Sequence, residues 1–227
     1  MRIIKRVLLL FFVLILAYQG WLLAQVIYWK SHPPAATSFM KIRLAELQEK
    51  NPKVKLQYQW VPYERISLNL KRAVVASEDD KFMEHSGFDW EGIEYALHRN
   101  QRKGKRVAGG STITQQLAKN LFLSPSRSYL RKGQEAVITV MIETFWDKRR
   151  ILEVYLNVVE WGNGVFGAEA GARRQFQQSA SSLSEYQAAH MAVMLPSPRR
   201  FEQHMPAYVL EHEQNVQERM RYSSVPR

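Results

Sequence analysis

The chain has 227 residues, no cysteine and a formal net charge of +11. This length allows one anchored domain and is too short for two catalytic domains, and the lack of cysteine excludes disulfides and thiolate chemistry. The positive charge indicates an anionic partner, which could be nucleic acid, acidic lipid or a phosphorylated substrate.

An apolar run follows the first six residues. Residues 7–29 contain no charged side chain, and as a helix they would extend about 35 Å, enough for a hydrocarbon core of roughly 30 Å. A cleaved signal peptide would have a shorter apolar region, so the run predicts an uncleaved membrane anchor. Arg2, Lys5 and Arg6 precede it and only Lys30 directly follows, which places residues 1–6 in the cytoplasm and the rest outside. That orientation argues against a nucleic-acid partner.

The remaining residues predict a short juxtamembrane linker and one mainly α-helical domain. The linker spans residues 30–46 and contains SHPPAAT, and the domain spans residues 47–227. Apolar spacing after Ser67 predicts a helix with Glu78 at its end or just beyond. Further helices are expected after a capping box of Thr112 and Gln115, over residues 131–146 and 148–159, and after a capping box of Ser182 and Glu185. A minor strand is expected within residues 57–61.

The densest cluster of acids is EDDKFMEHSGFD, residues 78–89. Such a segment could be a solvated acidic turn, or it could hold a carboxylate at the mouth of a cleft. We expect His85 to form structural hydrogen bonds rather than bind a metal, because no second histidine lies at ligand spacing and HExxH is missing. No metal site in the protein is therefore predicted.

Two later segments could recognise a phosphate or a sugar. In GGSTITQQLAKNLFL, helical spacing gathers Thr112, Gln116, Lys119 and Asn120 on one side, and the glycines before the helix favour anion binding at its N-terminus. Nucleotide hydrolysis is not expected, since the Walker lysine spacing is absent. In the next segment, Arg127, Arg131 and Lys132 come just before Glu135. Taken alone, this pattern is that of an ordinary basic surface.

In this order, EDDKFMEHSGFD, GGSTITQQLAKNLFL, RKGQE, KRRILEVYLNVVEWGNGVFG and LSEYQAAHMAVMLPSP resemble the five signature segments of the peptidoglycan glycosyltransferase family. The resemblance implies a lysozyme-like helical lobe with a small membrane-proximal jaw, in an enzyme that polymerises lipid II. It implies that Glu78 is the catalytic base and Glu135 the second essential carboxylate. The cleft segment would contribute Ser111, Thr112, Gln115, Gln116, Lys119 and Asn120, and the phosphates would contact Lys119, Arg127, Arg131 and Lys148.

The resemblance also implies a mechanism and a location. Glu78 would accept the proton of an acceptor sugar hydroxyl, the donor carbon would invert, and the product would be a β-1,4-linked glycan with release of undecaprenyl pyrophosphate. Glu135 is expected to orient basic groups. No cofactor is required, although a divalent cation (Mg²⁺ or Mn²⁺) could bridge the phosphates. The catalytic domain would be periplasmic, on a single-pass anchor in the bacterial cytoplasmic (inner) membrane. Expected partners are lipid II, the growing lipid-linked glycan and the membrane, with other cell-wall synthesis or division proteins as candidates.

Two sequence features limit this interpretation, and two other functions compete with it. After the fourth segment the chain reads RRQFQQSA, where family members usually have an aromatic pair, glycine and lysine. No second domain carries the SxxK serine motif of a transpeptidase, so the enzyme is expected to be monofunctional. A lysozyme-like lytic hydrolase would also use paired carboxylates but would not need the basic residues near the second one. A non-catalytic cell-wall scaffold would not need either Glu78 or Glu135.

Overall fold

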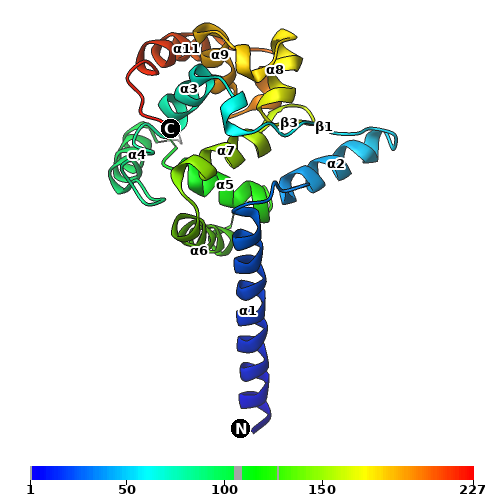
Figure 1. Ribbon diagram of the computed structural model, residues 1–227. Helices are drawn as coiled ribbons and strands as arrows, with labels where there is room; N and C mark the ends of the chain where they lie inside the picture. The colour runs from blue at the N-terminus through cyan, green and yellow to red at the C-terminus, as the bar shows by residue number, and fades with distance from the viewer. Residues whose placement is uncertain (1, 105–108, 127) are drawn as a thin grey trace.

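The computed structural model describes residues 2–104, 109–126 and 128–227 and is mainly α-helical (Figure 1), as the sequence predicts. The helices are α1 (Arg2–Trp29), α2 (Ser38–Lys50), α3 (Leu68–Glu78), α4 (Trp90–Lys103), α5 (Ile113–Phe122), α6 (Tyr129–Phe145), α7 (Lys148–Val158), α8 (Ala168–Phe176), α9 (Glu185–Met194), α10 (Pro198–Phe201) and α11 (Ala207–Arg219). Two 3₁₀ turns, Tyr63–Arg65 and Ala180–Ser182, complete the helical structure of the described residues.

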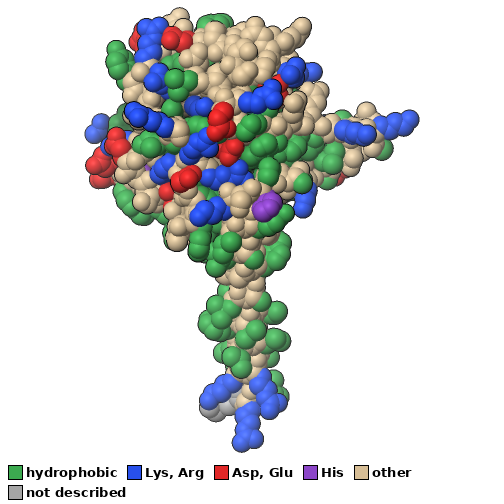
Figure 2. Space-filling view, in the orientation of Figure 1, with side chains coloured by type: hydrophobic (Ala, Val, Ile, Leu, Met, Phe, Trp, Pro, Cys, Tyr) green, Lys and Arg blue, Asp and Glu red, His purple; other side chains and the backbone are tan. Residues whose placement is uncertain are grey.

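Helix α1 projects from the rest of the molecule as a single rod (Figure 1). Its 28 residues are long and apolar enough to cross a membrane. Lys and Arg side chains surround the free end, and apolar side chains cover the shaft (Figure 2). Near its other end, Leu22 and Val26 are buried against the domain. The anchor is therefore packed onto the domain as well as joined to it.

The domain is built around α5 and α9. Helix α5 packs against α6 and α7, and α9 packs against α3 and α11. Apolar residues such as Leu70, Leu117 and Ile138 are completely buried in the shared core. The C-terminal end of α3 lies against the N-terminal end of α5, where the Ile113 N–H donates to Asp79. Residues from distant segments therefore meet at this end of α3.

A small sheet lies beside these helices. Strand β1 (Gln57–Tyr58) pairs in parallel with β3 (Val165–Phe166), and β2 (Glu160–Gly162) pairs antiparallel with β3 on its other side. The minor strand expected within residues 57–61 is confirmed at its first two positions. Gly167 has a φ of +85°, and a Cβ there would lie 2.8 Å from the carbonyl oxygen of Asn157, so the glycine permits the tight turn into α8.

Two local predictions differ from the structure. Residues 38–46 of the expected linker belong to α2, whose N-cap Thr37 accepts a hydrogen bond from the backbone N–H of Met40. The capping box of α9 is formed by Ser184 and Gln187, so the prediction of Ser182 and Glu185 was wrong. Both pairs fit the spacing of a capping box, and Ser182 instead lies in a 3₁₀ turn.

Candidate active site

Glu78 is the last residue of α3, and its carboxylate is held by α5. The Gln116 amide nitrogen Nε2 donates a hydrogen bond of 2.7 Å to Glu78 Oε2. Behind it, the hydroxyl of the buried Tyr155 on α7 donates to Gln116 Oε1 at 2.9 Å. Tyr155 thus fixes which end of the Gln116 amide faces the carboxylate, and the carboxylate receives a donor rather than another acceptor.

The surroundings of Glu78 make its carboxyl a stronger base than an exposed glutamate. Burial raises the pKa of Glu78 above its ordinary value, and the neighbouring Asp79 charge adds to this effect. The hydrogen bond from Gln116 and the charge of Lys119 oppose it. A raised carboxyl pKa with a fixed hydrogen bond suits a group that accepts a proton during a reaction.

Asp79 attaches the acidic segment to the start of α5. Its Oδ1 lies 2.8 Å from His85 Nε2, and its Oδ2 accepts a hydrogen bond of 2.9 Å from the Ile113 N–H. The Gly87 N–H donates to His85 Nδ1 at 3.1 Å, which makes Nε2 the protonated nitrogen. The expected structural role of His85 is confirmed, and the segment is not a loose, solvated turn.

The residues of the cleft segment divide into two groups. Thr112 and Gln115 form the predicted capping box of α5, both are buried, and the Thr112 hydroxyl also donates to the Gly87 carbonyl at 2.8 Å. The buried Asn120 donates to the Gln116 carbonyl. These three side chains shape the segment, while Gln116 and Lys119 are the two that act on Glu78.

The second carboxylate, Glu135 on α6, is buried between two cations. Arg131 Nη1 lies 2.5 Å from Glu135 Oε2, and Lys132 pairs with Oε1. Lys132 Nζ also lies 3.3 Å from the Ser111 hydroxyl. The buried Arg131 Nε has no hydrogen-bond partner among the described residues. Glu135 therefore orients a cationic group that retains an unused donor.

Lys119 links the two carboxylates electrostatically. Burial lowers the pKa of Lys119, and Glu135 and Glu78 oppose this shift, whereas Arg131 and Lys132 reinforce it. The Lys119 ammonium lies 5.6 Å from the ring centre of Phe39 on α2. The site thus places a cation within the field of both acids.

One predicted phosphate contact, Lys148, pairs with an acid other than Glu78 and Glu135. Lys148 Nζ lies 2.8 Å from Glu143 Oε1 and 4.6 Å from the Phe82 ring centre, and Thr114 donates to the same Glu143 oxygen. Lys148 is thus held in an internal ion pair. Arg127 lies outside the described residues.

Sequence reasoning missed two members of the site. Lys132 stands beside Arg131 in RKGQE, and its pair with Glu135 is ordinary within one helix, but its contact with Ser111 requires the start of α5 to be packed against α6. Tyr155 follows the apolar pattern of α7 and resembles an ordinary core aromatic; only its hydroxyl contact distinguishes it. Within the described residues, no group of three or more His, Asp or Glu side chains is arranged to hold a metal ion.

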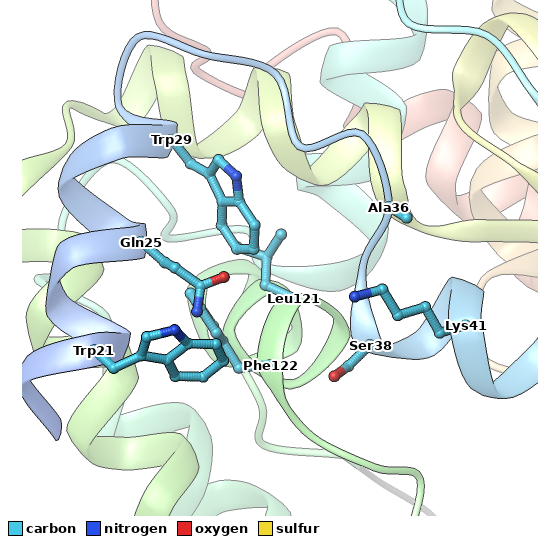
Figure 3. A pocket seen from close by; sticks show the side chains of 8 residues that line it. All are labelled: Trp21, Gln25, Trp29, Ala36, Ser38, Lys41, Leu121 and Phe122. Carbon is cyan, nitrogen blue, oxygen red and sulfur yellow. The ribbon is translucent and has the colours of Figure 1, made fainter. Parts of the chain in front are cut away.

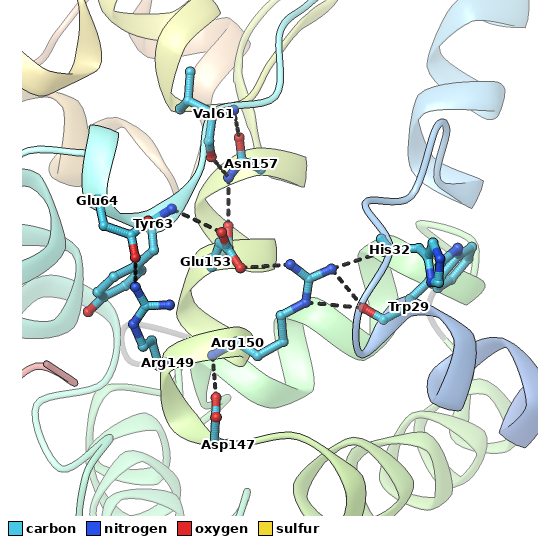
Figure 4. A network of polar contacts seen from close by, with 10 residues as sticks. All are labelled: Trp29, His32, Val61, Tyr63, Glu64, Asp147, Arg149, Arg150, Glu153 and Asn157. Atoms are coloured by element: carbon cyan, nitrogen blue, oxygen red, sulfur yellow. Dashed lines mark hydrogen bonds and ion pairs between the residues drawn. The ribbon is translucent and has the colours of Figure 1, made fainter.

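A polar network on α7 connects the anchor to this region (Figure 4). The guanidinium of Arg150 donates to the carbonyls of Trp29 and His32, at 2.7 and 2.9 Å from Nη2, and to Glu153 Oε2 at 2.6 Å from Nη1. Glu153 Oε1 accepts from the Tyr63 N–H at 2.9 Å. Glu153 is architectural, and the end of α1 is fixed to the helix that supplies Tyr155.

The fold and the site define a class: a helical enzyme on an apolar anchor helix, with one carboxylate of raised pKa and a second carboxylate held between two cations. The Transglycosylase family model matches residues 45–222, and the chain belongs to this family. The chain is 60% identical over 225 residues to the biosynthetic peptidoglycan transglycosylase of Azoarcus sp. (strain BH72), covering 99% of this chain and 97% of that protein. It is 62% identical over 191 residues to the protein of the same name from Thiobacillus denitrificans, covering 84% and 82%. The resemblance found in the sequence is confirmed.

Proposed function

We propose that this chain is a peptidoglycan glycosyltransferase that polymerises lipid II into β-1,4-linked glycan and releases undecaprenyl pyrophosphate. One observation carries the proposal: Glu78, held by Gln116, shares Lys119 with a second carboxylate that binds two further cations. Family membership and the names of the relatives support the same reaction. The absence of transpeptidase activity belongs to the proposal.

Glu78 acts as the general base. It accepts the proton of the acceptor C4 hydroxyl while that oxygen forms a bond to C1 of the donor sugar, and the bond from C1 to the pyrophosphate breaks. The pyrophosphate leaves with the electron pair. A well-placed base contributes about a hundredfold to ten-thousandfold to the rate. Attack opposite the leaving group inverts C1 in a single displacement.

The cations around Glu135 stabilise the leaving group. Pyrophosphate gains negative charge as its bond to the sugar breaks, and cations already in place lower the energy of that state without reorganisation. Arg131 offers its free Nε, and Lys132 and Lys119 add positive charge. A divalent cation such as Mg²⁺ or Mn²⁺ would be held by the substrate phosphates and would supply further charge. Glu135 orients the protein cations and does not transfer a proton.

The substrate's lipid explains the anchor. Helix α1 holds the enzyme as a single-pass protein in the bacterial cytoplasmic membrane, with the basic N-terminus inside and the catalytic domain in the periplasm. Lipid II and the growing lipid-linked glycan occupy the same membrane surface. Other cell-wall synthesis or division proteins are candidate partners.

A lytic hydrolase is the competing enzyme. It would activate water with a similar carboxylate, but its sugar leaving group carries no phosphate. The buried Glu135 paired with two cations favours the transferase, since a hydrolase gains nothing from cations at that position.

The test uses the purified full chain in detergent with labelled lipid II. We expect the wild type to form glycan polymer and Glu78→Gln to form none, while Glu84→Gln, an exposed acid in the same segment, keeps activity. Shortening of preformed glycan would identify a hydrolase instead. A wild type inactive on both substrates would favour a scaffold.

A further inference from the structure

A groove opens where the anchor meets α2 and α5, and it is not part of the site above. It encloses about 100 Å³. Trp21, Gln25 and Trp29 line it from α1, Ser38 and Lys41 from α2, and Phe122 from α5 (Figure 3). The anchor forms one wall, so the groove lies at the level where a membrane span ends.

The groove contains a polar group that the protein leaves unsatisfied. The Gln25 amide nitrogen Nε2 is buried and has no hydrogen-bond partner among the described residues. Gln19, six positions earlier on α1, differs: its amide exchanges two hydrogen bonds with the amide of Gln134 on α6, at 2.8 and 3.1 Å. A buried amide in an apolar setting is costly without a partner. The contrast between the two glutamines indicates that the partner of Gln25 is a bound molecule.

Lys41 supplies a second donor from the opposite wall. In Figure 3 the ammonium group of Lys41 extends over the groove toward the side on which Gln25 lies. No ion pair of Lys41 with an acid occurs among the described residues. Lys41 is cationic and the unpaired Gln25 nitrogen is a donor, so the complementary ligand carries an anionic oxygen.

The walls and the volume restrict that ligand further. Trp21, Trp29 and Phe122 provide apolar surface next to the two donors, a combination that suits a molecule with a charged head and a hydrocarbon body. The groove is small, which suits a phosphate group together with the first carbon atoms of its hydrocarbon body. Aromatic side chains at the end of a membrane span lie at the level of lipid headgroups.

We propose that this groove binds the phosphate of an anionic bilayer phospholipid, with Gln25 and Lys41 as its donors and the aromatic wall along the start of the acyl chains. The bound lipid also contacts the first turn of α2. Phe39, next to Ser38 in the chain, has its ring beside Lys119. The phospholipid therefore stabilises the turn of α2 that packs against the catalytic cation.

The binding test uses the full chain in a mild detergent and dihexanoyl phosphatidylglycerol as the probe, measured by isothermal titration calorimetry. We expect saturable binding, weakened about tenfold or more in Gln25→Leu and in Lys41→Gln, because each variant removes a hydrogen bond to a charged group. Lys50→Gln, a charge-matched control on the same helix, should bind like the wild type. Circular dichroism of each variant checks that the fold is intact.

Four results would overturn the proposal. Equal affinity in wild type, Gln25→Leu and Lys41→Gln would show that the lipid binds elsewhere. Equal binding of dihexanoylglycerol, which lacks the phosphate, would reduce the effect to apolar adsorption, and equal binding of inorganic phosphate would make it a simple anion site. Tighter binding of geranylgeranyl phosphate would assign the groove to a prenyl substrate. No lipid II is used, so the result does not depend on whether the enzyme polymerises it.

Discussion

The Gln116 amide donates its hydrogen bond of 2.7 Å to Oε2 of Glu78, and the hydroxyl of Tyr155 determines that it donates. Since Oε2 accepts this bond, Oε1 is the oxygen that receives the acceptor's proton in the proposed mechanism. The hydrogen bonding of the Glu78 carboxylate is thus set by a residue on α7 that does not bond to it.

Tyr155→Phe tests this relationship. Without the hydroxyl, Gln116 loses its fixed orientation and donates less to Glu78, so the pKa of Glu78 should rise further. We expect roughly a tenfold loss of polymerisation rate near neutral pH, the effect of about one hydrogen bond, and an acid limb of the pH profile moved to higher pH. The control is Tyr222→Phe, at an exposed position. A slower variant with an unchanged pH profile would reduce Tyr155 to a packing residue.

The raised pKa of Glu78 also predicts that Glu78→Gln, which should abolish activity, increases the stability of the protein at neutral pH. At pH values above 4.5, the ordinary pKa of a glutamate, the folded protein retains a proton on Glu78 that the unfolded chain loses. Burial of Glu78 therefore lowers stability as pH rises through the pKa of the folded state. We expect Glu78→Gln to be more stable than wild type at pH 7, by about 1 kcal/mol, and equally stable below pH 4.5. Thermal unfolding across this range is the measurement, and a less stable variant at pH 7 would contradict the assignment.

Glu135→Gln should disorder the two cations that stabilise the pyrophosphate in the proposed mechanism. Arg131 and Lys132 would repel each other without the acid between them, and the organised charge in the transition state would be lost. We expect kcat to fall about a hundredfold or more, with a smaller change in KM for lipid II. Glu185→Gln removes the exposed partner of Arg221 and should leave both parameters unchanged, because surface ion pairs contribute little. A change in KM alone would assign Glu135 to ground-state binding.

Arg150→Met should loosen the joint between the anchor and α7. The variant loses three hydrogen bonds to main-chain carbonyls and leaves Glu153, which is only 9% exposed, without its cation. We expect a loss of about 3 kcal/mol in stability, measured by thermal unfolding of the full chain in detergent. Arg149→Met, the neighbouring position paired with the exposed Glu64, should cost less than about 1 kcal/mol. Equal losses in the two variants would refute the special role of Arg150.

Removal of divalent cations should slow the enzyme without stopping it. Arg131, Lys132 and Lys119 already provide positive charge, so we expect chelation to lower the polymerisation rate less than about tenfold. Full loss of activity with EDTA, restored by Mg²⁺ or Mn²⁺, would show that a metal is required.

The sequence predicts well those features that depend on local pattern. Thr112 with Gln115 opens α5 as predicted, because a capping box is complete within four residues. Helix α2 was not expected because its apolar residues form no clear stripe, and its stability comes from contacts such as the buried pair of Arg43 with Glu160 on β2. Strands β2 and β3 are two or three residues long and form only because they pair with each other and with β1.

The site shows the same division. Glu78 and Glu135 can be located because their segments keep recognisable residues. The sequence also indicates Gln116, Lys119 and Arg131, but it does not separate them from polar neighbours that point into the protein. Thr112, Gln115 and Asn120 have the polarity of substrate ligands but direct it into the protein. Lys132 and Tyr155 become visible only when α5 is placed between α6 and α7.

The pair of Gln19 and Gln134 gives the anchor a role that a tether does not have. The two hydrogen bonds between the Gln19 amide on α1 and the Gln134 amide on α6 fix the rotation of α1 and its position along α6. Gln134 is next to Glu135 in the chain. Arg150 fixes the same helix again at its end. In the proposed membrane orientation, the height of Glu78 and Glu135 above the bilayer is therefore set within α1. Inserting residues into the stretch 30–37 would leave that height unchanged, whereas an unrelated apolar helix would insert equally well and lose the alignment.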